Sequence, residues 1–171
     1  KYLYLNNTGH GGSGGFAVDS TKVTLNNTYS DANTNGRSYI AYSFHSVDGY
    51  SKIGSYTANN SANGPFVYTG FKPSFVLLKH VSGTAYSSSD HWWVFDNSRD
   101  PFATTLTTLA IANSAAEDGI KGDSAIDSYD ISFLRYDISF LSNGFKIEGS
   151  GEGINFNGDF FYMDFAEDPA K

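Results

Sequence analysis

The sequence contains no cysteine, which excludes a disulfide framework and a thiolate metal site. Charged residues are also scarce, at 17%, and their balance is acidic, with a formal net charge of −7. A phosphate backbone is bound by clustered lysine and arginine, so this balance argues against a nucleic-acid partner. No apolar run approaches the ~20 residues of a membrane-spanning helix, so we expect no membrane insertion.

The start of the sequence shows no charged segment followed by an apolar one, so no signal peptide is visible. Because the chain begins with Lys1 rather than methionine, we expect it to be part of a longer polypeptide. Its 171 residues suffice for one domain with its own core. We divide it into lead-in strands and loops at 1–36, which could end a preceding domain, and a main domain at 37–171.

Aromatic residues reach 16% of the chain, and 18 glycines separate short stretches of alternating aromatic and β-branched residues. Such stretches favour strands, and the glycine, asparagine and proline residues between them favour turns. We expect strands at 1–5, 16–18, 22–25, 37–47, 50–57, 66–71, 74–80, 91–95, 145–148 and 159–166. The pattern predicts an all-β fold, an antiparallel β-sandwich of jelly-roll or lectin-like type.

Two of these segments carry specific expectations. In 37–47, Ile40, Tyr42 and Phe44 share one face, and the Asp48-Gly49 turn signal follows directly. Segment 104–116 is the one plausible helical or irregular stretch, because its leucine spacing suits a short helix, although its four threonines weaken that interpretation.

The polar loop tip at 58–64 is a candidate contact site through Asn59, Asn60 and Asn63, whose amides suit a polar ligand. A second candidate is the Trp92-Trp93 pair, which places one indole on each face of a strand. We expect one indole in the core, and the other could form a sugar-stacking platform with Tyr86 and His91. The alternative at both places is a purely structural role.

No catalytic or metal motif is evident in the sequence. The four histidines lack metal-ligand spacing, and no Gly-x-Ser-x-Gly nucleophile motif is present. Paired carboxylates of a glycosidase could come from eight acidic residues. They are Asp90, Asp96, Asp100, Glu148, Glu152, Asp159, Asp164 and Glu167. Asp164 stands out because it lies mid-strand between apolar residues, so we expect it either on the wet face or paired with Arg99 or Lys79.

We expect no cofactor, with calcium as a weak alternative. Calcium takes carboxylate oxygens in loops, and an acidic stretch offers them, although its spacing is not that of an EF-hand. The residues concerned are Asp118, Asp123, Asp127, Asp130 and Asp137. A solvated acidic loop is the favoured interpretation of these residues.

Five separated segments carry a family resemblance. They read YIAYSFHSVDGYSKIGSYT (39–57), NGPFVYTGFKPSFVLLK (63–79), WVFDNSRDPF (93–102), LSNGFK (141–146) and YMDFAEDP (162–169). In order and spacing they resemble a β-rich domain at the C-terminal end of bacteriophage tail fibres and virion structural proteins, marine phages especially. The chain departs from that pattern at Asp164, where the family typically has alanine, and at a local duplication over 129–141.

The resemblance implies a virion structural protein in an extracellular setting, with no catalytic residues to carry over. Its expected partners are further copies of itself, as a homo-oligomer such as a trimer, other virion proteins, and a host-surface glycan or receptor. We therefore expect a tail fibre or surface appendage domain that serves host contact or subunit assembly. The alternatives are a polysaccharide-degrading enzyme of the virion, and a capsid decoration or filament-forming module without a ligand.

Overall fold

The computed structural model describes residues 15–25, 32–83, 92–98, 108–111, 138–149 and 154–169, with 108–111 described by its backbone alone. Ordered secondary structure in these ranges consists of strands. Within the same ranges, no helix has the length and apolar character needed to cross a membrane.

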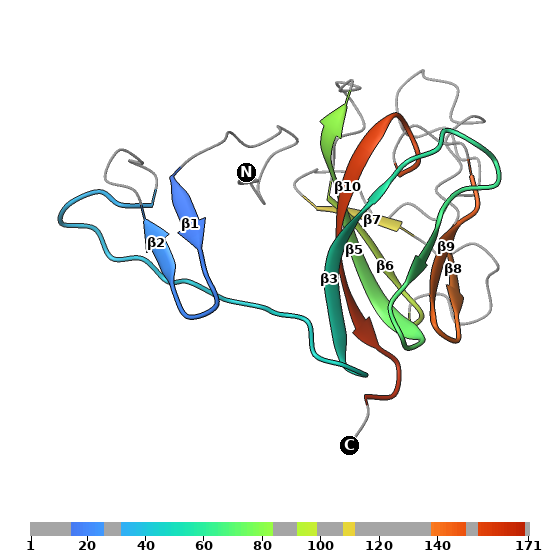
Figure 1. The fold of residues 1–171 in the computed structure, drawn as a ribbon, viewed down its shortest axis with the longest axis horizontal. Helices are drawn as coiled ribbons and strands as arrows, with labels where there is room; N and C mark the ends of the chain where they lie inside the picture. Colours follow the sequence, from blue (N-terminus) through green and yellow to red (C-terminus); the bar gives the residue numbers. More distant parts are fainter. Residues whose placement is uncertain are drawn as a thin grey trace.

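Two antiparallel sheets form the body of the molecule (Figure 1). The larger sheet has the strand order β3-β10-β5-β6-β7. Its strands are β3 (Ser51–Thr57), β10 (Gly158–Ala166), β5 (Pro73–Gly83), β6 (Trp92–Asp96) and β7 (Thr108–Ile111). The smaller sheet has the order β4-β9-β8, from Phe66–Tyr68, Gly144–Ile147 and Ile138–Leu141. The prediction of an all-β antiparallel sandwich is confirmed.

The main core lies between the two sheets. The larger sheet contributes side chains of alternate residues, among them Leu78, Phe95 and Phe160, and the smaller sheet contributes Ile138 and Phe145. Burial of one such large apolar side chain stabilises the fold by about 1.5–3 kcal/mol. Aromatic contacts order the core further, because Phe160 stacks on Tyr56 with ring centroids 5.2 Å apart.

The opposite face of the larger sheet carries a second cluster, in which Leu77, Trp92 and Val94 are buried. Phe161 and Met163 of β10 pack against it, so β10 presents apolar side chains on both faces. Phe161, Met163 and Phe165 therefore share one face of β10, as the alternation of buried and half-buried residues along the strand shows. Strand β5 is buried on both faces as well, since its residues enter both clusters.

The N-terminal part stands apart from the sandwich (Figure 1). Strands β1 (Phe16–Val18) and β2 (Val23–Leu25) form the predicted pair, with Asp19 closing the turn through hydrogen bonds from the backbone N–H groups of Thr21 and Lys22. These hydrogen bonds lower the pKa of Asp19 below its ordinary value. All six strand residues are exposed, and a lone two-stranded hairpin has marginal stability in water.

The predicted strand at 37–47 is wrong, apart from its last residue. Val47 pairs with Ser51 across the Asp48-Gly49 turn, and Gly49 has a φ of 69°. At the next position the Ser46 hydroxyl, rather than a backbone group, bonds the backbone of Ile53. The chain therefore leaves the sheet there, and 37–46 continues as an extended segment that joins no strand ladder with the described residues.

The helical interpretation is also wrong for Thr108–Ile111, the described part of 104–116, because strand β7 lies there and pairs with β6. The β-branched threonines favour a strand, and the open edge of β6 provides the partner. The strand expected at 66–71 is shorter than predicted and ends at Tyr68. The strand expected at 1–5 and most of the duplicated stretch, 129–137, fall outside the described residues.

Candidate functional site

The loop at 58–65 connects the two sheets, because β3 belongs to the larger sheet and β4 to the smaller one (Figure 1). It therefore lies at one end of the sandwich. Its far end is held against β9, where the Ile147 amide donates a hydrogen bond of 3.1 Å to the Pro65 carbonyl. Gly64 is required at this point, since a Cβ there would collide with the Ile147 backbone.

Asn155 fixes the conformation of this loop from inside. Its side chain is fully buried and accepts a hydrogen bond of 3.0 Å from the Asn59 amide. Its Nδ2 group donates to Asn59 Oδ1 at 3.1 Å, and to the Ser61 and Gly149 carbonyls at 2.8 Å each. A buried polar side chain is tolerated when its hydrogen bonds are made. Asn155 therefore has a structural role: its hydrogen bonds fix the loop in place, and we call it the pin of the loop.

The three candidate asparagines of the loop have different roles. The Asn59 side chain is used within the loop, because it donates to the Asn63 carbonyl at 2.9 Å and accepts from the Ser61 amide at 3.1 Å. Asn60 adopts a φ of 52°, a left-handed conformation that asparagine tolerates well. The side-chain amides of Asn60 and Asn63 are exposed and make no hydrogen bond to the described part of the chain.

The expected indole platform is wrong. Trp92 and Trp93 are each only 7% exposed, one in each hydrophobic cluster. The Trp92 ring meets the Phe161 ring edge to face, with centroids 6.1 Å apart, so it offers no open face for a sugar ring. Tyr86 and His91, the other expected members of the platform, lie outside the described residues.

The candidate carboxylates do not form a catalytic pair among the described residues. Register places Asp96 opposite Phe75, on the second face of the larger sheet, whereas Asp164 lies on the core face. Glu167 forms an ion pair with Lys72 at 2.6 Å and accepts a hydrogen bond from Asn97 at 2.9 Å.

Three other candidate carboxylates, Asp90, Asp100 and Glu152, fall outside the described residues. Of the remaining two, Glu148 forms an ion pair with Lys146 at 3.1 Å, and Asp159 accepts hydrogen bonds from Thr57 and Ser82 at 2.8 Å each. Two carboxylates that flank one glycosidic bond must face a common cleft. The positions of Asp96 and Asp164 exclude that arrangement for this pair.

Asp164 is fully buried, so the expectation of a wet-face position is wrong. Lys79 is not its partner, because Lys79 stands opposite Phe161 and faces the other side of the sheet. Neither carboxyl oxygen accepts a hydrogen bond of good geometry from the described residues. Arg99, the other expected partner, lies outside them.

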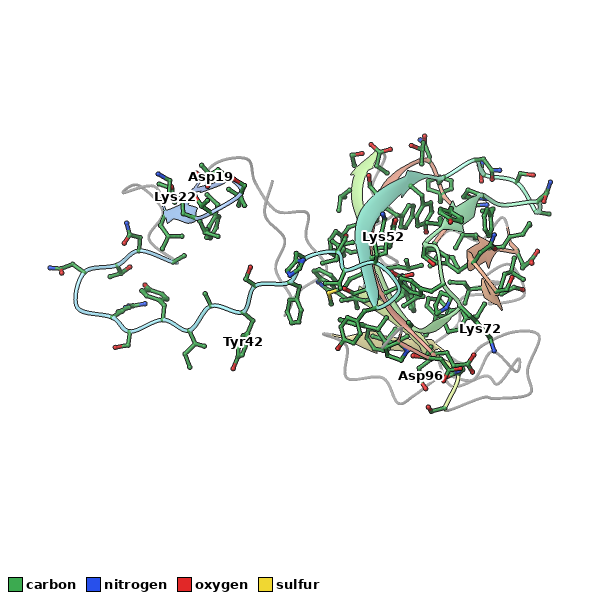
Figure 2. The ribbon with its side chains drawn as sticks, turned by 60° about the horizontal axis from the view of Figure 1, so that its bottom comes forward. Asp19, Lys22, Tyr42, Lys52, Lys72 and Asp96 are labelled. Atoms are coloured by element: carbon green, nitrogen blue, oxygen red, sulfur yellow. The ribbon has the colours of Figure 1, made fainter. Side chains whose placement is uncertain are left out.

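Burial raises the pKa of Asp164 to about 7. The amide groups of Lys52 and of Asp164 itself lower this pKa in part, and so does the Lys52 ammonium, which stands on the neighbouring strand opposite Asp164 (Figure 2). The charge of Asp164, together with burial, raises the pKa of Tyr162 in turn. This carboxyl is a source of pH-dependent stability rather than a ligand contact, because it is closed off from solvent.

Metal ligation finds no support in the described ranges, where no group of three or more histidine and carboxylate side chains comes together. The acidic stretch from Asp118 to Asp137, proposed as a calcium alternative, falls outside these ranges.

A family model described as a domain of unknown function (DUF7483) matches residues 1–169. No curated protein and no solved structure matches the sequence.

Proposed function

We propose that this chain, which belongs to the DUF7483 family of domains of unknown function, is a non-catalytic structural domain of a virion appendage such as a tail fibre. The resemblance of five sequence segments to phage tail fibre and virion structural proteins supports this setting. The acidic surface and the separate engagement of the described carboxylates agree with a role in contact rather than in catalysis.

The observation that carries a contact role is the pinned loop at 58–65. Its backbone is held by the buried Asn155, while the amides of Asn60 and Asn63 remain open to solvent. A preorganised loop loses little conformational entropy when it binds. Each amide offers two donors and an acceptor, which match the hydroxyl groups of a sugar. The proposed ligand class is therefore a host-surface glycan.

The test is a glycan array, followed by titration of the best-bound glycan. We expect Asn60→Gly, which preserves the left-handed backbone, and Asn63→Ala to weaken binding about fivefold or more each, the effect of one lost hydrogen bond. Asn35→Ala is the matched control, since Asn35 is also exposed but lies in the N-terminal part. Equal binding by all four proteins, or binding to no glycan, would contradict the proposal.

A further inference from the structure

We propose that the extended segment at 39–45 is a strand donated to a second copy of this chain, where it adds to the edge of β3 at Ser55 and Thr57. The inference is independent of ligand binding by the loop. Ile40 is 82% exposed, Tyr42 81% and Phe44 59%, and they alternate along the segment as the apolar face of a strand does. Figure 2 shows Tyr42 standing clear of the sandwich on this segment.

The acceptor is the edge of β3 that faces away from β10. Ser51 exchanges two hydrogen bonds of 2.9 Å with Val47 on that edge, and Ile53 bonds the Ser46 hydroxyl there. Ladder alternation gives Ser55 and Thr57 the same orientation. The backbone N–H and C=O of Ser55 find no partner in the described part of the chain on this edge. An unpaired strand edge is a template for another strand.

The alternation of the two segments agrees in one antiparallel register. If Ser43 stands opposite Ser55, then Tyr42 stands opposite Tyr56 and Phe44 opposite Gly54. Tyr56 belongs to the main core, and the side of Gly54 that would bear a Cβ is covered by the ring of Tyr162. The three large apolar side chains of the donor, Ile40, Tyr42 and Phe44, would therefore extend the main core. Its remaining residues, Tyr39, Ala41, Ser43 and His45, would face the other side of the sheet.

The chain's own segment is not placed to fill this edge. Beyond Val47 it departs from β3, because the Ser46 hydroxyl takes the Ile53 backbone groups that the backbone of His45 would otherwise bond. From there it runs away from the sandwich towards the β1–β2 hairpin (Figure 1). An extended chain of ten residues spans about 33 Å, which is enough to reach a neighbouring molecule.

The surface available matches what a stable dimer requires. Each aromatic side chain can bury 150–250 Å², so one donated segment would bury on the order of 350 Å² of side-chain surface. In a reciprocal exchange, two donated segments and the two surfaces that they cover become buried. If each of these four surfaces loses a similar area, the total buried area is about 1,400 Å². Stable protein interfaces bury about 1,200–2,000 Å² in total. A second copy of the chain suits this interface, because each copy carries both the donated segment and the β3 edge that accepts it.

The absence of cysteine allows a direct cross-linking test. One preparation carries Ser43→Cys and a second, larger tagged preparation carries Ser55→Cys, and the two are mixed under mild oxidation. Directly opposite residues in a ladder lie about 5.5 Å apart between Cα atoms, within the range that a disulfide spans. We expect a mixed disulfide dimer that forms at least tenfold faster than with the matched control Ser98→Cys, an exposed serine in the turn after β6.

A double variant with Ser43→Cys and Ser55→Cys in one chain separates the alternatives. A disulfide within single chains, with no mixed dimer, would show that the segment closes on its own β3 and would overturn the proposal. Mixed cross-linking no faster than with the Ser98→Cys control would also overturn the proposal. The segment would then be covered by another protein or by no partner, and not by the β3 edge of a second copy. Neither substituted serine lies in the core, so these variants are expected to fold.

Discussion

The sandwich body and the described N-terminal arm, residues 15–25 and 32–46, carry the same sequence pattern with opposite structural outcomes. In β10, alternate apolar residues enter two hydrophobic clusters, and the strand has partners on both sides. In the arm, Ile40, Tyr42 and Phe44 alternate in the same way but remain exposed. Alternation therefore makes a segment suitable for a sheet, and an available strand edge decides whether it becomes one.

The largest difference is expected between two phenylalanines. Phe160 in β10 is 1% exposed and stacks on Tyr56, whereas Phe44 in the arm is 59% exposed. Phe160→Ala should lower the free energy of unfolding by about 3–5 kcal/mol, because it removes buried surface and leaves a cavity. Phe44→Ala should change it by less than about 0.5 kcal/mol in dilute solution, because the Phe44 side chain is largely exposed. Chemical denaturation at low protein concentration measures both changes. Equal losses of unfolding free energy in the two variants would contradict the contrast between β10 and the arm.

A smaller effect is expected from Asp164, an ionisable side chain that is fully buried in the sandwich body. Its pKa is about 7 in the folded chain against about 3.9 when unfolded, so folding retains a proton between these values. The free energy of unfolding should therefore fall as pH rises from about 4 to 7, by on the order of 3 kcal/mol, and level off above 7. Asp164→Asn should flatten this profile. An unchanged profile in the variant would assign the pH dependence to other groups.

Asn155 allows a test at a single loop of the body, which it holds through buried hydrogen bonds. Asn155→Ala should lower the free energy of unfolding by about 2 kcal/mol, since the Asn59 amide and the Ser61 carbonyl lose a partner. It should also raise the amide exchange rate at 59–63 and weaken any ligand contact made there. Faster exchange across the whole protein, without a local effect, would contradict the pinning role.

Strand alternation predicted most of the body, because β3, β5 and β10 find partners within the chain. The same rule failed at 37–47, since the pattern is local and the hydroxyl of Ser46 blocks the continuing ladder. It also failed at 104–116, where leucine spacing fits a helix and the neighbouring edge of β6 favours a strand.

The candidate site was predictable only in part. Turn residues marked the loop tip, but the pin, Asn155, lies 96 residues from Asn59 in a glycine-rich stretch that is typical of a turn. Nothing in that stretch distinguishes a buried asparagine from an exposed one. The sequence did single out Asp164 as unusual, because a carboxylate between apolar residues must be solvated, paired or neutralised. Its neutralisation by burial depends on neighbouring strands that a linear pattern does not specify.

Amide hydrogen exchange over a range of protein concentrations tests the contrast between body and arm most directly. We expect β10, the strand between β3 and β5, to be protected at every concentration. Segment 39–45 should exchange freely in dilute solution and become protected as concentration rises, together with Ser55 and Thr57 on the edge of β3. Protection of 39–45 that is already complete in dilute monomer, or that is absent at every concentration, would contradict the account.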